Sequence, residues 1–202
     1  AVDIAMHTIE RYFCPGEDTY LTDSIAEAVI KSTRKAAFDC MKNPDDYTAR
    51  ANMMWASSLA HNGLTQCGRE FQLVVHQFEH ELSGMYPKIA HGAGLAALWC
   101  SWARYVYKAN ISRWLQYSAN VWNLDIDYEH PEKTIEEVIN LQEQYYVSLG
   151  MPIGLKTLGV EEASLTKLAL NCSRNKTRTL TGYKPLAYDD ILAIYQMAYE
   201  RG

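Results

Sequence analysis

Three short patterns in this sequence place carboxylate and imidazole groups where they could share one metal ion. Asp3 and His7 stand four residues apart, and so do His76 and His80. On a helix this spacing puts both side chains of a pair on one face. His91 precedes two nearby glycines, which let the backbone come close to a ligand. One carboxylate with two or three imidazoles suits Fe(II) or Zn(II), so the sequence predicts a site for a first-row metal.

A second hypothesis uses the same histidines differently. The segment His76-Gln77-Phe78-Glu79-His80 spells H-x-x-E-H, the inverted pattern of zinc peptidases, in which both histidines bind zinc and Glu79 acts as general base. This hypothesis explains neither the Asp3/His7 pair nor His91, and it requires a strand beside the cleft, which the sequence does not predict. It also needs a third ligand from a later helix, for which the sequence offers Glu132, Glu136 and Glu137.

A third hypothesis assigns the histidines to structure alone. The chain would then be a helical interaction module that binds no stoichiometric metal. For two of the six histidines we expect a structural role in any case. His61 stands at a predicted helix end, where an imidazolium complements the helix dipole, and His130 precedes Pro131 in a predicted solvated loop.

Composition excludes several classes of protein. The 202 residues are 48% hydrophobic and 21% charged, which is typical of one globular domain. A formal net charge of −5 disfavours a nucleic-acid partner, and no apolar run is long enough to span a bilayer. The five cysteines show no paired spacing and no signal peptide precedes them, so we expect reduced thiols and a cytoplasmic protein.

Helical periodicity positions these residues. Apolar residues recur at helical spacing through most of the chain, and no stretch alternates with period two. We therefore predict an all-α, multi-helix fold of about eight or nine helices in one domain covering residues 1–202. The expected helices cover residues 4–14, 19–41, 71–86, 95–107, 111–121, 131–149, 161–170 and 188–199, with 91–94 as a turn before residue 95. A further helix follows a cap at residues 43–46, carries acidic residues in its first turn and stops at residue 62.

Five segments of the sequence resemble the helical C-terminal domain of the iron-containing alcohol dehydrogenases. They are the residues from Asp3 to Phe13, from Met54 to Gly63, from His76 to Tyr86, from His91 to Ala96, and Gly182-Tyr183-Lys184-Pro185-Leu186. The resemblance covers the whole chain and is greatest to the butanol dehydrogenase branch, which is usually NADP-dependent. It implies the metal-binding half of a two-domain, dehydroquinate synthase-like dehydrogenase.

The resemblance also implies roles for particular residues. Asp3, His7, His76 and His91 would hold one ion, Fe(II) or Zn(II). His80 corresponds to an additional histidine of the family, which lies beside the metal and is not a ligand, and we predict that it relays a proton. The sequence departs from the family pattern between His76 and His91, where it is one residue longer.

The same resemblance implies that a second, N-terminal domain belongs to the protein. The family carries an N-terminal dinucleotide-binding domain, and these residues contain no glycine-rich phosphate loop. The chain also opens at Ala1 inside a helical pattern. We therefore expect a fragment that is inactive alone. Joined to its own N-terminal domain, which would bind NADP or NAD, it would interconvert a small primary alcohol and its aldehyde. We also expect self-association into a homo-oligomer.

Overall fold

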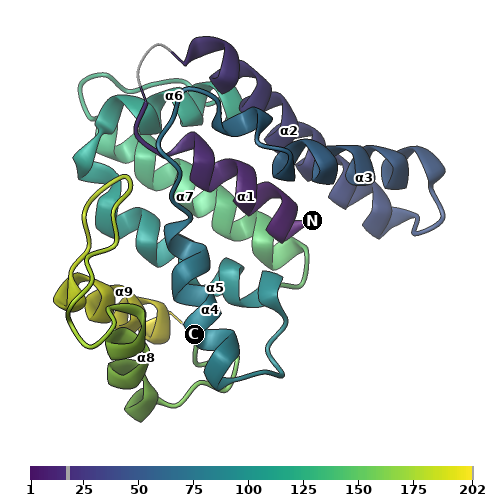
Figure 1. Cartoon of the computed structure of the whole chain (residues 1–202). Helices are drawn as coiled ribbons and strands as arrows, with labels where there is room; N and C mark the ends of the chain where they lie inside the picture. Colours follow the sequence, from purple (N-terminus) through teal and green to yellow (C-terminus); the bar gives the residue numbers. More distant parts are fainter. Residues whose placement is uncertain (17–18, 202) are drawn as a thin grey trace.

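The chain is built of helices joined by loops (Figure 1). The computed structural model describes residues 1–16 and 19–201. Within these residues no strand forms, and the sheet-like contacts are two isolated bridges, Gly16 with Arg69 and Leu180 with Leu186. The prediction of an all-α fold is confirmed. The α-helices in the described part are α1 Val2–Tyr12, α2 Tyr20–Lys42, α3 Tyr47–His61, α4 Val74–Met85, α5 His91–Val106, α6 Ile111–Trp122, α7 Pro131–Ser148, α8 Leu165–Cys172 and α9 Tyr188–Glu200, with short 3-10 turns at Leu64–Gln66, Tyr107–Ala109 and Glu162–Ser164.

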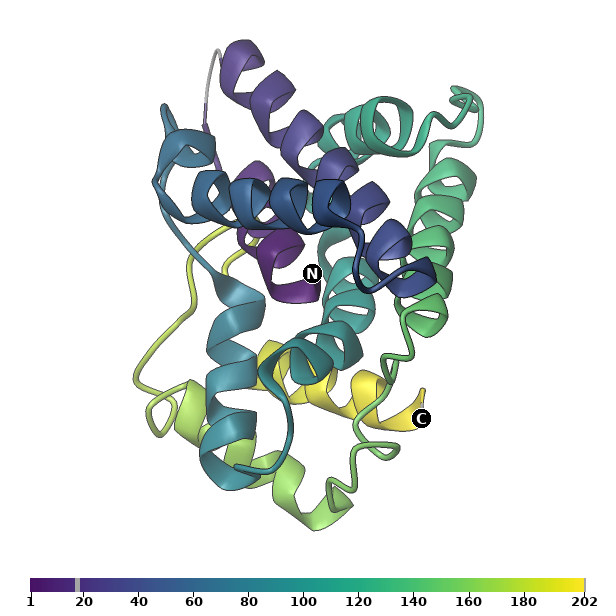
Figure 2. The ribbon, with the colours of Figure 1, turned by 90° about the vertical axis from the view of Figure 1, so that its right-hand side faces the viewer.

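Helix α5 lies in the middle of the structure and contacts α1, α4, α7 and α9 (Figure 2). Every residue from Leu95 to Ala103 is at most 3% exposed. This run is apolar on all sides of the helix apart from Ser101, and such a helix must be surrounded by others. Because α5 begins at His91, the packing of the core fixes where that imidazole lies.

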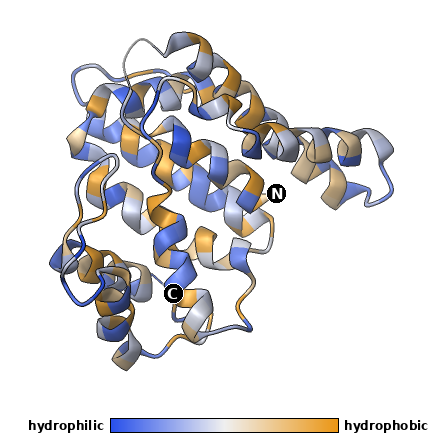
Figure 3. Ribbon diagram, in the orientation of Figure 1, coloured by the Kyte–Doolittle hydropathy of each residue, from blue (hydrophilic) through white to orange (hydrophobic). Residues whose placement is uncertain are grey.

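The outer helices carry apolar residues on one face and polar residues on the other, so the colour of their ribbons changes repeatedly along their length (Figure 3). Helices α2 and α3 pack side by side, and the connection between them lies away from the core (Figure 1). The Asp46 side chain accepts a hydrogen bond of 3.0 Å from the Ala49 N–H, so a cap lies in the expected segment, but Asp46 is the N-cap itself and the first turn of α3 carries no acidic residue. None of the helices in the described residues is both long and apolar enough to cross a membrane.

Three predicted boundaries were wrong. Helix α4 begins at Val74 and not at Phe71, because the backbone N–H groups of Val75 and His76 donate to the Glu10 carboxylate, which caps the helix start from another helix. The residues from His91 to Gly94 are the first turn of α5 and not a turn before it. The helix expected over 161–170 is a 3-10 turn followed by α8.

A buried ionic network fastens α1 to the neighbouring helices. The Asp23 carboxylate in α2 pairs with the Arg69 guanidinium, and it also accepts a hydrogen bond of 2.5 Å from Arg113 of α6. The Tyr12 hydroxyl of α1 donates to Glu27 at 2.8 Å, one turn along α2. Both guanidiniums lie over the Tyr12 ring, at 5.4 and 4.7 Å. The network therefore holds the helix that carries Asp3 and His7.

This network predicts the effect of one substitution. Asp23→Asn keeps the shape of the side chain but leaves the buried Arg69 without its charge partner, so we expect a loss of about 3 kcal/mol in the free energy of unfolding. Asp39→Asn is the matched control, because Asp39 pairs with the exposed Lys35 and should cost less than about 1 kcal/mol. Urea unfolding at neutral pH measures both. Equal losses would contradict the assignment.

Candidate metal centre

Four side chains from three helices converge on one point. Asp3 and His7 come from α1, His76 from α4 and His91 from the first turn of α5. The Oδ1 atom of Asp3 lies 3.6 Å from Nε2 of His7, 3.2 Å from Nε2 of His76 and 3.4 Å from Nε2 of His91. One carboxylate oxygen therefore faces three imidazole nitrogens, and the four residues singled out from the sequence lie together.

Two buried carboxylates orient two of these imidazoles. Nδ1 of His76 lies 2.5 Å from Oε2 of Glu10, and Nδ1 of His91 is hydrogen-bonded to Oε2 of Glu79. An ionised carboxylate only accepts hydrogen bonds, so each Nδ1 carries the proton that it donates. Nε2 of each ring is then the nitrogen that faces Asp3. A carboxylate on the far nitrogen is the usual support of a metal-binding histidine.

His7 has a different neighbour on its far nitrogen. Nη1 of Arg11 lies 3.1 Å from Nδ1 of His7 and also donates to the His7 carbonyl oxygen at 2.8 Å. A guanidinium only donates, so in this geometry Nδ1 accepts and the His7 proton lies on Nε2. Coordination through Nε2 requires that proton to move, and Arg11 must then give up its contact with Nδ1 while it keeps the carbonyl.

The charges around Asp3 shift the pKa values of the site. The hydrogen bond from His76 lowers the pKa of Asp3 to about 2, although burial opposes the shift. Burial lowers the pKa of His7 to about 3. Burial would also lower the pKa of His76, but its hydrogen bonds with Asp3 and Glu10 outweigh that effect and raise the value to about 9. Without a cation, the His76 proton is what offsets the two carboxylates.

His80 lies beside this group and outside it. The residue is exposed on α4, its ring is stacked on that of His91 with centroids 5.6 Å apart, and it lies 6.0 Å from the ring of His76. The geometry does not support the peptidase hypothesis, because His76 faces Asp3 while Glu79 is fully buried and bonded to His91. The proposed third ligands lie on α7, where Glu136 pairs with Arg104.

His61 extends the row of imidazoles on the other side. Its ring centroid lies 4.0 Å from that of His7. Nδ1 of His61 is 2.8 Å from the carbonyl oxygen of Ser57, so the ring lies at the end of α3, where the sequence places it. Five of the six histidines therefore form one contiguous row, and His130, exposed at the start of α7, is the sixth.

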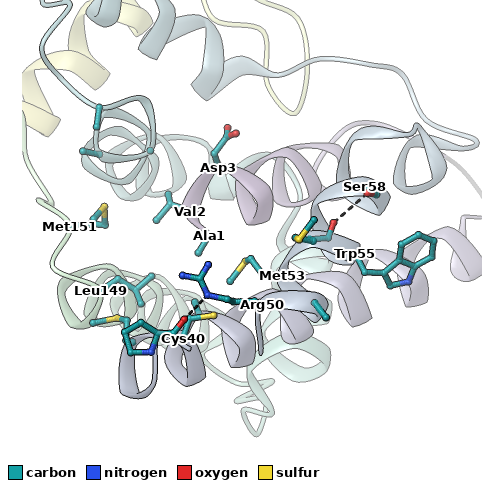
Figure 4. A pocket seen from close by; sticks show the side chains of 18 of the residues that line it. Ala1, Val2, Asp3, Cys40, Arg50, Met53, Trp55, Ser58, Leu149 and Met151 are labelled. Atoms are coloured by element: carbon teal, nitrogen blue, oxygen red, sulfur yellow. Dashed lines mark hydrogen bonds between the residues drawn. The ribbon is translucent and has the colours of Figure 1, made fainter. Parts of the chain in front are cut away.

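An apolar cleft of about 1190 Å³ opens beside Asp3 (Figure 4). The sequence does not predict this cleft, because its walls come from the start of α1, the joined ends of α2 and α3, the first turn of α5 and the segment after α7. Methionines are prominent in these walls, and their flexible side chains adapt to ligands of different shape. The lining includes Val2, Cys40, Met41, Met53, Met54, Ala93, Leu149 and Met151.

Comparisons with known proteins find relatives that match nearly the whole of this chain. The family model described as "Fe-containing alcohol dehydrogenase family, C-terminal" matches residues 1–199. NADH-dependent butanol dehydrogenase A of Clostridium acetobutylicum is 38% identical over 98% of this chain and 50% of its own length. NADPH-dependent aldehyde reductase YqhD of Escherichia coli is 28% identical over 98% of this chain, again covering 50% of the relative.

A solved structure shows the same fold. The crystal structure of NADH-dependent butanol dehydrogenase A from Thermotoga maritima matches with a TM-score of 0.90 and 30% sequence identity. The match covers 98% of this chain and 50% of that one. The chain thus spans about half the length of the curated relatives and of the solved structure that it matches.

The raised pKa of His76 predicts how stability depends on pH. The folded-state pKa of about 9 exceeds the usual 6.5, so the protonated ring stabilises the metal-free chain fully below pH 6.5, and this stabilisation is lost as the pH rises through 9. We expect the free energy of unfolding, measured with a chelator present, to fall by about 3 kcal/mol over this range. In His76→Gln the free energy of unfolding should depend much less on pH, whereas in His130→Gln its pH dependence should be unchanged. A pH-independent free energy in the unmodified chain would contradict the prediction.

Proposed function

The chain belongs to the Fe-containing alcohol dehydrogenase family, and from this premise we propose that it is the metal-binding half of an enzyme that transfers hydride between a nicotinamide dinucleotide and a small primary alcohol or aldehyde. The observation that carries the proposal is the convergence of three imidazole Nε2 atoms on one oxygen of Asp3. The relatives that this chain matches are about twice as long as it is. The activity therefore belongs to a protein that also holds a dinucleotide.

The donor set fits one divalent cation. Asp3, His7, His76 and His91 would hold it with one carboxylate and three imidazoles, which suits both Fe(II) and Zn(II). Two of the imidazoles already direct Nε2 to the common point, because Glu10 and Glu79 occupy their other nitrogens. When bound, the cation supplies a Lewis acid that polarises the oxygen of the alcohol or aldehyde.

Buried and exposed residues around the centre have different proposed roles. Glu10 and Glu79 are buried and orient the ligands, whereas the Asp3 and His91 side chains are 39% and 37% exposed. The centre is therefore accessible on the side of Asp3 and His91, where the cleft receives the apolar part of the substrate. The exposed His80 ring, stacked on His91, would take the hydroxyl proton or return it.

The other half of the enzyme would supply the dinucleotide site. No glycine-rich phosphate loop occurs in this sequence, so we propose that an N-terminal domain, packed over the exposed side of the centre, binds NADP or NAD. The names of the relatives include both NADH and NADPH, and the proposal therefore covers either cofactor. Homo-oligomeric assembly and a cytoplasmic location, the latter favoured by five free cysteines in the described residues, complete the proposal.

Metal titration of the 202-residue chain tests the proposed ligands. We expect one tight Co²⁺ or Zn²⁺ ion per chain, measured by calorimetry and by the visible spectrum of the Co²⁺ form. Asp3→Asn, His76→Ala and His91→Ala should each weaken this binding about 100-fold or more, because the first removes the negative charge of the carboxylate and the other two each remove a donor. His80→Ala and the exposed control His130→Ala should bind normally. Loss of the tight ion in His80→Ala, with retention in His91→Ala, would favour the peptidase hypothesis.

A substitution at Gly94 tests whether Glu79 positions His91. A Cβ at Gly94 would lie 2.8 Å from both Cγ and Oε1 of Glu79, so Gly94→Ala should displace the carboxylate that holds His91. We expect metal affinity to fall about 10- to 100-fold, as in Glu79→Gln. The matched control is Gly84→Ala on α4, where a Cβ meets nothing within 4 Å. Unchanged affinity in both glycine variants would remove Glu79 from the positioning of His91.

A further inference from the structure

A second set of metal donors lies next to the first. Glu79 and His80 of α4 and His91 of α5 each offer one donor atom, and these atoms lie within 4.8 Å of one another. We propose that the set is a second, weaker site for a divalent cation of the zinc type, filled when the cation exceeds one per chain. The proposal rests on the proposed function only because His91 belongs to both donor sets.

The chemistry of the donors supports this assignment. Two imidazoles and one carboxylate are a common protein donor set for Zn²⁺, with water in the fourth position. Glu79 is fully buried, and its carboxylate is bonded to the Ser83 hydroxyl and to Nδ1 of His91. A buried carboxylate is costly without a positive partner, so a cation that replaces the His91 proton gives Glu79 a stronger one.

Access and charge also favour a second ion. His80 is exposed and the His91 side chain is 37% exposed, so a cation can reach the set from solvent without unfolding any helix. Asp3, Glu10 and Glu79 bring three carboxylates to this cluster, more negative charge than one divalent cation neutralises. Arg11 supplies one further positive charge at His7, but the side-chain partners of Glu79 in the described residues are the Ser83 hydroxyl and His91, and not a permanent cation.

The shared ring of His91 makes the second ion the weaker one. Nε2 of His91 faces Asp3, and Nδ1 faces Glu79. To coordinate through Nδ1, the ring must release to solvent the proton that it donates to Glu79, and two cations on one imidazole repel each other. The second ion would also coordinate His80, so excess cation would occupy the group proposed to move the proton.

Counting bound ions in the 202-residue chain tests the proposal. We expect native mass spectrometry and calorimetry with Zn²⁺ alone to find two ions per unmodified chain, the second binding at least about 10-fold more weakly than the first. His80→Ala should lose the second ion and keep the first. The control is His61→Ala, because His61 lies at the opposite end of the row of imidazoles and should keep both ions. Helical circular dichroism checks that each variant is folded.

The other outcomes separate this proposal from the proposed function. One ion in the unmodified chain at every concentration overturns the second site and leaves the first. No tight ion at all contradicts the proposed function itself. Two ions in His80→Ala, or loss of the second ion in His61→Ala, overturn the assignment to Glu79, His80 and His91, because the second ion would then be bound elsewhere.

Discussion

The Glu10 carboxylate is the interaction on which the centre depends. It is buried in α1, accepts the Val75 and His76 backbone N–H groups at the start of α4, and holds Nδ1 of His76. Helix starts leave N–H groups without partners and attract negative charge. The Glu10 side chain therefore caps two of these N–H groups and also orients the His76 ring. It also fixes how α1 and α4 meet. The relative position of Asp3 and His76 follows from that one contact.

Glu79 orients a histidine at the start of α5, as Glu10 does at the start of α4, but its hydrogen bond there is with the side chain and not with the backbone. It bonds to His91 at the start of α5, and the absence of a side chain at Gly94 leaves room for its carboxylate. The centre is thus enclosed by two buried carboxylates that need positive partners and by histidines that can supply either protons or a metal. In the metal-free chain the proton on His76 takes that place. A divalent cation does the same work with more charge, which is a physical reason for these residues to bind one.

The sequence predicted what depends on local spacing. The helices, the four residues around Asp3 and the separate place of His80 follow from helical periodicity together with the family resemblance. The start of α4 was misplaced because its cap is Glu10, more than 60 residues earlier in the chain. The cleft beside Asp3 was missed for the same reason, since a cleft arises only when distant helix ends meet. The Arg11 contact with His7 is local, because the two residues stand four apart on α1, and that spacing could have predicted it.

The centre has a buried side and a side that faces the surface. Glu10, His76 and Glu79 lie at the buried side, whereas Asp3, His91 and His80 face the surface. A site that only stabilised the fold would gain from burying all its donors, because water competes for the cation. Here the orienting groups are buried and part of the donor set is left open next to an apolar cleft. That arrangement suits a cation that must accept a further ligand with an apolar body, as the proposed function requires.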